Sequence, residues 1–367
     1  MSGADDGASP FRGRRARLRE ALEEPGLEGL LVSHPPNVRY LSGFEGSAGL
    51  LLVHGEEALL VVDGRYAEQA ADEADGGVEV RVAGSGLLEG LGDELSEEGS
   101  ALPLGFEAEH TTVSGRDRLE EEASGADWRP AEGLVEALRA RKDADELERI
   151  ARAARAADRA WEGLAQVLEE GMSEREAAAE MDYRLRREGD GPPAFDTIVA
   201  FGERSALPHA RPADRRLREG DLVLVDGGAT VDAYRSDLTR VASAGEPADW
   251  QRELHGTVEA ARAAAVQAVV AGRPAREVDA AARERLEAAG RADVFPHSTG
   301  HGIGLEVHER PSVSSRSDEI LREGNVVTIE PGVYLRGRGG VRLEDDVAVE
   351  ADGARVLTET DRRLRIL

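Results

Sequence analysis

The chain contains no cysteine among its 367 residues, which excludes disulfide bridges, thiolate metal sites and a cysteine nucleophile. Any metal ion that it binds must therefore be held by oxygen and imidazole groups. No run of about 18 apolar residues occurs, so we expect no membrane span. Residues 1–10 are polar and acidic and lack the basic start and apolar stretch of a signal peptide, so we expect a cytoplasmic protein.

Lysine is almost absent as well, since Lys142 is the single lysine and the other cationic side chains are arginines. Against 46 cationic residues stand 73 acidic ones, which gives a formal net charge of −27. A surface of this sign repels nucleic acid and anionic membranes, so we expect neither as a partner. The surplus of carboxylates indicates a halophilic protein, because concentrated salt screens the self-repulsion. A GC-rich genome, which also favours arginine, alanine and glycine, is the alternative explanation.

The length of the chain predicts two domains. In the first, residues 11–130, strands alternate with helices, as is typical of an α/β domain. Short apolar runs bounded by glycine, proline, histidine or acidic residues predict its buried strands. Helices are predicted at residues 11–26 and 66–74, and strands at 29–32, 49–53, 58–62 and 78–82.

The second domain, residues 143–367, is predicted to be α+β, with about four helices packed on an extensive, hairpin-rich sheet. Ser173 and Glu176 form a capping-box pattern at the start of its second helix. Helices are predicted at residues 143–170, 173–189, 249–270 and 275–289, and strands at 197–200, 221–226, 237–242, 326–330 and 345–349.

Two hairpins of this domain carry acidic residues beside apolar strands. Asp226 ends one apolar run and Asp237 begins the return strand. In the second hairpin, Glu330 ends the apolar run and Glu344 lies on the return. A carboxylate beside an apolar strand is costly unless its charge is compensated. One such residue is ordinarily a strand-end cap, but four in the same arrangement indicate a shared site.

Three of the eight histidines lie between the hairpins within 13 residues: His297, His301 and His308. The glycine-rich stretch 300–304 lacks the lysine of a phosphate-binding loop and does not fit the dinucleotide spacing. Four carboxylates and a histidine without cysteine suit two divalent ions such as Mn²⁺, Co²⁺ or Zn²⁺. Such a pair of ions makes a water molecule nucleophilic near neutral pH.

These segments resemble the superfamily of creatinase, aminopeptidase P, prolidase and methionine aminopeptidase, whose catalytic domain has the pita-bread fold. Residues 11–130 resemble its creatinase-type N-terminal domain, and residues 236–240 match its Ser-Asp-Xaa-Thr-Arg signature. The resemblance implies two metal ions, with Mn²⁺ expected first, and two bridging ligands, Asp237 and Glu344. The full set of implied metal ligands is Asp226, Asp237, His301, Glu330 and Glu344.

The proline-specific branch of the superfamily implies further roles. His209, within residues 205–209, and His297 would line the substrate site, the latter near the proline ring. His308 would hydrogen-bond the scissile peptide, and Arg342 would orient the site. Glu330 is the expected proton shuttle.

Two positions depart from the family pattern. The usual Asp-Phe-Gly is here Asp226-Gly227-Gly228, and Arg235 replaces a small residue before the signature. Neither change removes a predicted ligand.

The function expected first is an Xaa-Pro aminopeptidase, because residues 37–49 and 63–66 resemble the aminopeptidase P branch. An Xaa-Pro dipeptidase, or prolidase, is the alternative, since the loops that would exclude longer peptides are not readable from sequence. A catalytically inactive pita-bread binding protein is the alternative from another class, but such relatives have typically lost ligands. The expected substrates are peptides with proline in second position, and the resemblance implies a homodimer or homotetramer.

Overall fold

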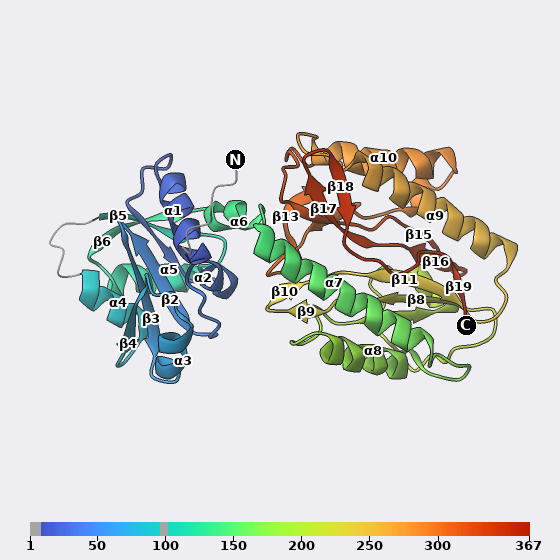
Figure 1. Cartoon of the computed structure of the whole chain (residues 1–367), viewed down its shortest axis with the longest axis horizontal. Helices are drawn as coiled ribbons and strands as arrows, with labels where there is room; N and C mark the ends of the chain where they lie inside the picture. The colour runs from blue at the N-terminus through green and yellow to red at the C-terminus, as the bar shows by residue number, and fades with distance from the viewer. Residues whose placement is uncertain (1–8, 96–101) are drawn as a thin grey trace, which may run out of the picture. The chain divides into compact units, whose positions relative to one another are not determined.

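The computed structural model describes residues 9–95 and 102–367, and the chain forms two compact units, Met1–Arg139 and Ala140–Leu367 (Figure 1). Within the described ranges, no helix is long and apolar enough to cross a membrane. Most of the polar segment on which the cytoplasmic expectation rests, residues 1–8, lies outside the described residues.

The first unit is built on a six-stranded sheet of order β4-β3-β2-β1-β5-β6. The β1–β2 and β2–β3 pairs are antiparallel, and the other three are parallel. Its strands are β1 (Gly29–Val32), β2 (Gly49–His54), β3 (Glu57–Asp63), β4 (Glu79–Ala83), β5 (Leu102–Glu107) and β6 (Ala126–Ala131). Its helices are α1 (Pro10–Leu22), α2 (Pro35–Ser42), α3 (Ala67–Glu73), α4 (Leu87–Leu95), α5 (Val113–Glu122) and α6 (Leu134–Arg139).

Four predicted strands and two predicted helices of this unit are found. Helix α1 ends at Leu22 rather than at residue 26 because Pro25 and Gly26 form a turn, with Gly26 at a φ of 67°.

The second unit carries the four predicted helices: α7 (Ala144–Ala165), α8 (Glu174–Glu188), α9 (Asp249–Ala268) and α10 (Ala275–Ala288). The capping box of Ser173 and Glu176 is present at the start of α8, and Asp143 with Glu146 forms another before α7. Helix α7 stops at Ala165, five residues earlier than predicted, because the chain turns before Gly171, whose φ is 91°.

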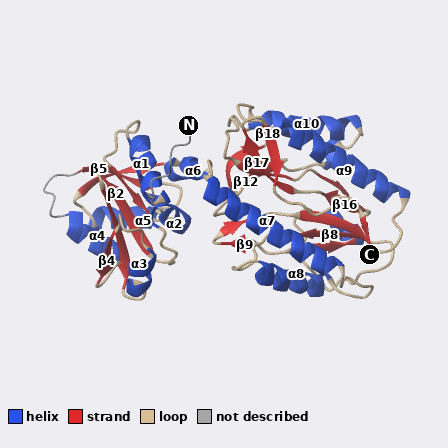
Figure 2. Cartoon of the chain, in the orientation of Figure 1, coloured by secondary structure: helices blue, strands red, loops and turns tan. Residues whose placement is uncertain are grey.

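The strands of this unit form two main sheets, where one extensive sheet was predicted (Figure 2). Their orders are β19-β11-β8-β7 and β13-β12-β14-β17-β18. The strands are β7 (Ile198–Phe201), β8 (Leu222–Asp226), β11 (Thr239–Ser243), β12 (Gly300–Gly302), β13 (Glu309–Val313), β14 (Val326–Ile329), β17 (Asp345–Glu350), β18 (Gly353–Val356) and β19 (Arg365–Ile366). The prediction failed because hydrophobic pattern identifies strands but not which strands pair.

Each main sheet contains one antiparallel hairpin with a two-stranded ribbon at its tip. The first hairpin joins β8 to β11 through the ribbon of β9 (Thr230–Val231) and β10 (Tyr234–Arg235). The second joins β14 to β17 through β15 (Gly332–Leu335) and β16 (Gly339–Arg342). In the second, Pro331 has no N–H to continue the β14 ladder.

Strand β8 is buried on both faces. Leu222 and Leu224 belong to the apolar cluster with α9 and α10, whereas Val223 and Val225 belong to the cluster with α7 and α8. Successive side chains of a strand point to opposite faces, which explains the uninterrupted apolar run before Asp226.

Candidate metal centre

The four acids of the two hairpins meet around His301 of β12. One ligand atom from each of Asp237, His301 and Glu344 lies within 4.8 Å of the others. The imidazole Nε2 is also 3.5 Å from Glu330 Oε1 and 3.8 Å from Asp237 Oδ2. Asp226 ends β8, and its charge acts on Asp237, Glu330 and Glu344. The structure thus brings together all five residues predicted as ligands.

The orientation of His301 is fixed by its own backbone surroundings. Its Nδ1 is 3.0 Å from the carbonyl oxygen of Gly302, which can only accept, so Nδ1 carries the proton and Nε2 faces the acids with its lone pair. Burial lowers the pKa of His301 to about 4, so the ring is neutral at pH 7. A Cβ on Gly300 would overlap the carbonyl oxygen of Thr328, so glycine allows β12 to approach β14 closely.

Arg342 of β16 forms an ion pair with this cluster of acids. Its Nη2 donates to Asp226 Oδ2 at 2.5 Å, its Nη1 to the Tyr334 hydroxyl at 2.9 Å, and its Nε to Thr239 Oγ1 at 3.0 Å. Burial opposes its charge, but Tyr334, Asp226 and the neighbouring glutamates raise the pKa of Arg342 well above its ordinary value. The guanidinium therefore stays charged and compensates part of the negative charge.

The carboxylates of this cluster also repel one another. Burial, followed by the neighbouring carboxylates, raises the pKa of Asp237 and of Glu344 well above their ordinary values. Burial and the charge of Asp226 raise the pKa of Glu330 to about 7, although Arg342 lowers it. A cation bound among these acids would remove the repulsion.

The donor set fits such a cation. Asp226 Oδ1 and Asp237 Oδ1 are buried, and neither has a hydrogen-bond partner within the described part of the chain. Buried carboxylate oxygens without partners are costly unless they bind an ion. Oxygen ligands with one imidazole and no thiolate suit Mn²⁺, Co²⁺ or Zn²⁺.

The histidines predicted to line the substrate site are linked to His301 or to Tyr334. The ring of His308 lies edge-on to that of His301, with centroids 4.4 Å apart. His297 places Nε2 2.8 Å from the Tyr334 hydroxyl, and burial lowers its pKa to about 4. His209 is exposed, and its charge acts on His297. The carbonyl of the preceding residue, Pro208, accepts a hydrogen bond from Arg342 at 3.2 Å.

Sequence reasoning missed three residues that hold the centre. Tyr334 joins His297 to Arg342, and Thr239 donates to Glu344 Oε2 at 2.6 Å. Asp346 Oδ2 accepts the backbone N–H of Asp237 at 3.0 Å. Thr239 lies inside the Ser-Asp-Xaa-Thr-Arg signature, which was a usable signal, whereas nothing in the sequence distinguishes Tyr334 or Asp346.

The structure shows what surrounds the two departures from the family pattern, at residues 227–228 and at Arg235. Gly227 has room for a Cβ, with Leu185 and Met181 side-chain atoms at 3.4 Å, whereas a Cβ on Gly228 would overlap the carbonyl oxygen of Ser236. Arg235 donates to the carbonyl of Ala194 at 2.7 Å. Neither position touches a predicted ligand side chain in these contacts.

The single lysine forms an ion pair next to the loop that carries His308. Lys142 is buried, and its Nζ is 3.1 Å from Glu309 Oε2. Glu309 Oε1 accepts the backbone N–H of Glu306 at 3.0 Å. The ion pair thus ties the segment before α7 to the loop that carries His308.

Comparison with known proteins extends over both units. Residues 148–351 match metallopeptidase family M24, and residues 14–141 match the creatinase/prolidase N-terminal domain. The chain is 37% identical over 352 residues to an Xaa-Pro dipeptidase of Pyrococcus furiosus, covering 96% of this chain and 99% of that protein. It is 38% identical over 351 residues to an uncharacterized peptidase of Bacillus subtilis, covering 96% of this chain and 99% of that protein.

Solved structures of similar proteins give the same result. An Xaa-Pro dipeptidase from Bacillus anthracis aligns with a TM-score of 0.93 at 38% identity, over 97% of this chain and 100% of that one. An X-Pro aminopeptidase from Thermotoga maritima aligns with a TM-score of 0.88 at 36% identity, over 95% and 100%. The predicted fold, a pita-bread catalytic domain preceded by a creatinase-type domain, is confirmed, and the chain belongs to metallopeptidase family M24.

Proposed function

We propose that this chain is an Xaa-Pro dipeptidase that uses two divalent metal ions, Mn²⁺ first among them. The observation that carries the proposal is the convergence of four carboxylates and His301, with buried oxygens of Asp226 and Asp237 that have no hydrogen-bond partner among the described residues. The dipeptidase now ranks above the aminopeptidase expected from sequence. Its support is the full-length similarity, at 37–38% identity, to proteins named Xaa-Pro dipeptidase.

Different residues of the chain have different roles in the proposed reaction. When bound, the ions polarise the scissile carbonyl and lower the pKa of water. Glu330, whose Oε1 lies 3.5 Å from Nε2 of His301, is the carboxylate that we assign to carry a proton to the proline nitrogen. His308 donates a hydrogen bond to the carbonyl oxygen, and His297 forms the wall beside the proline ring.

The test is hydrolysis of Gly-Pro beside Arg-Pro-Pro by the protein loaded with Mn²⁺, followed by mass spectrometry. We expect cleavage of Gly-Pro and no release of arginine from the tripeptide. Release of arginine would return the assignment to an Xaa-Pro aminopeptidase. Cleavage of neither peptide, with no bound metal, would favour an inactive binding protein. Gly-Ala serves as the control for the requirement for proline.

We extend the proposal to the working conditions. The net charge of −27 with one lysine supports a halophilic enzyme, since salt screens repulsion between surface carboxylates. The urea midpoint should rise between about 0.1 M and about 2 M KCl. An unchanged or lower midpoint would leave genome composition as the explanation.

We also propose the homodimer or homotetramer that the family resemblance implies. Light scattering on the native protein tests this oligomeric state.

A further inference from the structure

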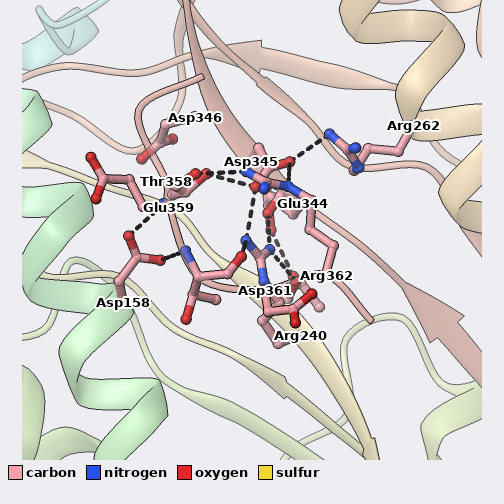
Figure 3. A network of polar contacts seen from close by, with 12 residues as sticks. Asp158, Arg240, Arg262, Glu344, Asp345, Asp346, Thr358, Glu359, Asp361 and Arg362 are labelled. Carbon is pink, nitrogen blue, oxygen red and sulfur yellow. Dashed lines mark hydrogen bonds and ion pairs between the residues drawn. The ribbon is translucent and has the colours of Figure 1, made fainter. Parts of the chain in front are cut away.

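Asp345 follows the predicted ligand Glu344 and is fully buried in β17. Its Oδ1 accepts Nη2 of Arg240 at 2.8 Å and the hydroxyl of Thr358 at 2.6 Å. Its Oδ2 accepts Nη1 of Arg262 at 2.7 Å and Nε of Arg362 at 2.8 Å (Figure 3). One carboxylate thus holds three guanidinium groups.

This arrangement exceeds what neutralising a buried acid requires. A single arginine would satisfy the charge of Asp345, yet three different segments supply one each: β11, α9 and the chain after β18. The three guanidinium groups and the Thr358 hydroxyl give each oxygen of the Asp345 carboxylate two hydrogen bonds. The cluster is a rigid, charged junction.

The junction continues directly to the metal centre through Arg240. Its Nη1 donates to the carbonyl oxygen of Glu344 at 2.5 Å and to that of Thr239 at 3.0 Å. The Thr239 hydroxyl in turn donates to Glu344 Oε2 at 2.6 Å. The backbone of Glu344 and the residue that orients its carboxylate are therefore both held by a guanidinium that Asp345 fixes in place.

The other end of the junction is the segment that follows β18. Thr358 and Arg362 bind Asp345, and the carbonyl of Thr360 accepts from Arg240 at 3.2 Å. Asp158 of α7 holds the same segment by accepting the backbone N–H groups of Glu359 and Thr360, at 2.6 and 3.0 Å. Figure 3 shows residues from helices, strands and the segment after β18 gathered around Asp345 and Glu344.

We propose that Asp345, Arg240 and Arg362 are positioning residues for Glu344, and that the segment 358–362 is a structural part of the metal centre. Their effect is to keep the Glu344 carboxylate in one place before metal binds. The inference rests on the proposed metal-dependent function.

The test uses Arg362→Gln, because the Arg362 side chain is 25% exposed and its loss leaves Asp345 with two arginines. The matched control is Arg363→Gln, which removes an 89% exposed neighbour paired with Asp361. Calorimetric titration of the metal-free proteins with MnCl₂ measures affinity without an activity assay. We expect about a 10-fold loss of affinity in the first variant and none in the control.

A second pair of variants guards against a general loss of packing. Thr358→Val removes the hydroxyl bound to Asp345, whereas Thr358→Ser keeps it, so affinity should fall in the first and recover in the second. Unchanged Mn²⁺ affinity in Arg362→Gln, with only a lower melting temperature, would overturn the inference. If the unaltered protein binds no Mn²⁺, the proposed function fails, which is a distinguishable result.

Discussion

The two hairpins of the second unit share one plan but are supported differently. The last residue of β8 is a predicted ligand, Asp226, whereas the predicted ligand Glu330 lies one residue beyond β14 and is followed by Pro331. The longer glutamate side chain reaches the same centre from further away. Arg342 of the second hairpin binds Asp226 of the first at 2.5 Å.

The support in the opposite direction comes from the first hairpin. Thr239 and Arg240 of β11 hold the side chain and the backbone of Glu344. In the same direction as Arg342, Asp346 of the second hairpin accepts the backbone N–H of Asp237 of the first. Each hairpin thus positions the acids of the other, so neither forms a metal centre by itself.

The largest effect should come from removing one bridging acid from either hairpin. Asp237→Ala and Glu344→Ala should each lower the rate of Gly-Pro hydrolysis by more than about 100-fold. Loss of a residue that only supports a ligand costs up to about 100-fold, so loss of a ligand itself should cost more. Both should also lose bound metal, because each removes a predicted ligand to two ions. Metal per chain is measured by mass spectrometry after dialysis. Full metal content with retained turnover in either variant would contradict the shared centre.

The next largest effect distinguishes the roles of Arg342 and Arg240, the two arginines that connect the hairpins. Arg342→Met leaves a buried acid without its ion pair and should cost about 3 kcal/mol of unfolding free energy in the metal-free protein. Mn²⁺ should restore part of this loss, since a cation replaces the charge beside Asp226. Arg240→Met should be destabilising by about 2 kcal/mol, because the Glu344 carbonyl loses its buried donor, and Mn²⁺ should not restore it.

Urea titrations with and without Mn²⁺ measure both variants. If Mn²⁺ changed the unfolding free energy of both variants equally, Arg342 and Arg240 would not have the separate roles proposed for them. The exposed pair of Arg355 and Glu350 supplies the control, and Arg355→Met should change stability by less than about 0.5 kcal/mol.

A smaller effect concerns Glu330 and pH. Its pKa is near 4.5 in the unfolded chain and about 7 in the folded one, so between these values the folded protein binds more protons. Stability of the metal-free protein should therefore fall as pH rises from 5 to 8, by about 3 kcal/mol from this group. Glu330→Gln should flatten the slope in urea titrations. A slope unchanged by the substitution would show that Glu330 is not its source.

The smallest effect tests the two glycines after Asp226. Gly227→Ala should raise the unfolding free energy by about 0.5 kcal/mol, because a Cβ there meets only ordinary contacts and the unfolded chain loses freedom. Gly228→Ala should lower it, since the Cβ would overlap the Ser236 carbonyl. Thermal unfolding of the pair is the measurement. A stabilised Gly228→Ala would show that the backbone can move there.

The sequence predicted the acids better than their supports. Asp226 and Glu330 stand out because a charge after an apolar strand needs a compensating partner. Asp345 and Asp346 lie beside Glu344 and look like a surface run of acids, yet each is buried. Two of their partners, Arg240 and Asp237, are 105 and 109 residues away in sequence, and these contacts join segments of two different sheets, which hydrophobic pattern does not specify. For the same reason, strand positions were predicted while the division into two sheets was not.

The burial of Lys142 has a consequence for chemical labelling. The chain has no other lysine, so the folded protein offers no exposed lysine amine to acylating reagents or amine-directed cross-linkers. Acylation of Lys142 then requires the contact with Glu309 to open. The rate at which this one amine reacts would therefore report, by mass, how often the segment before α7 detaches from the loop that carries His308.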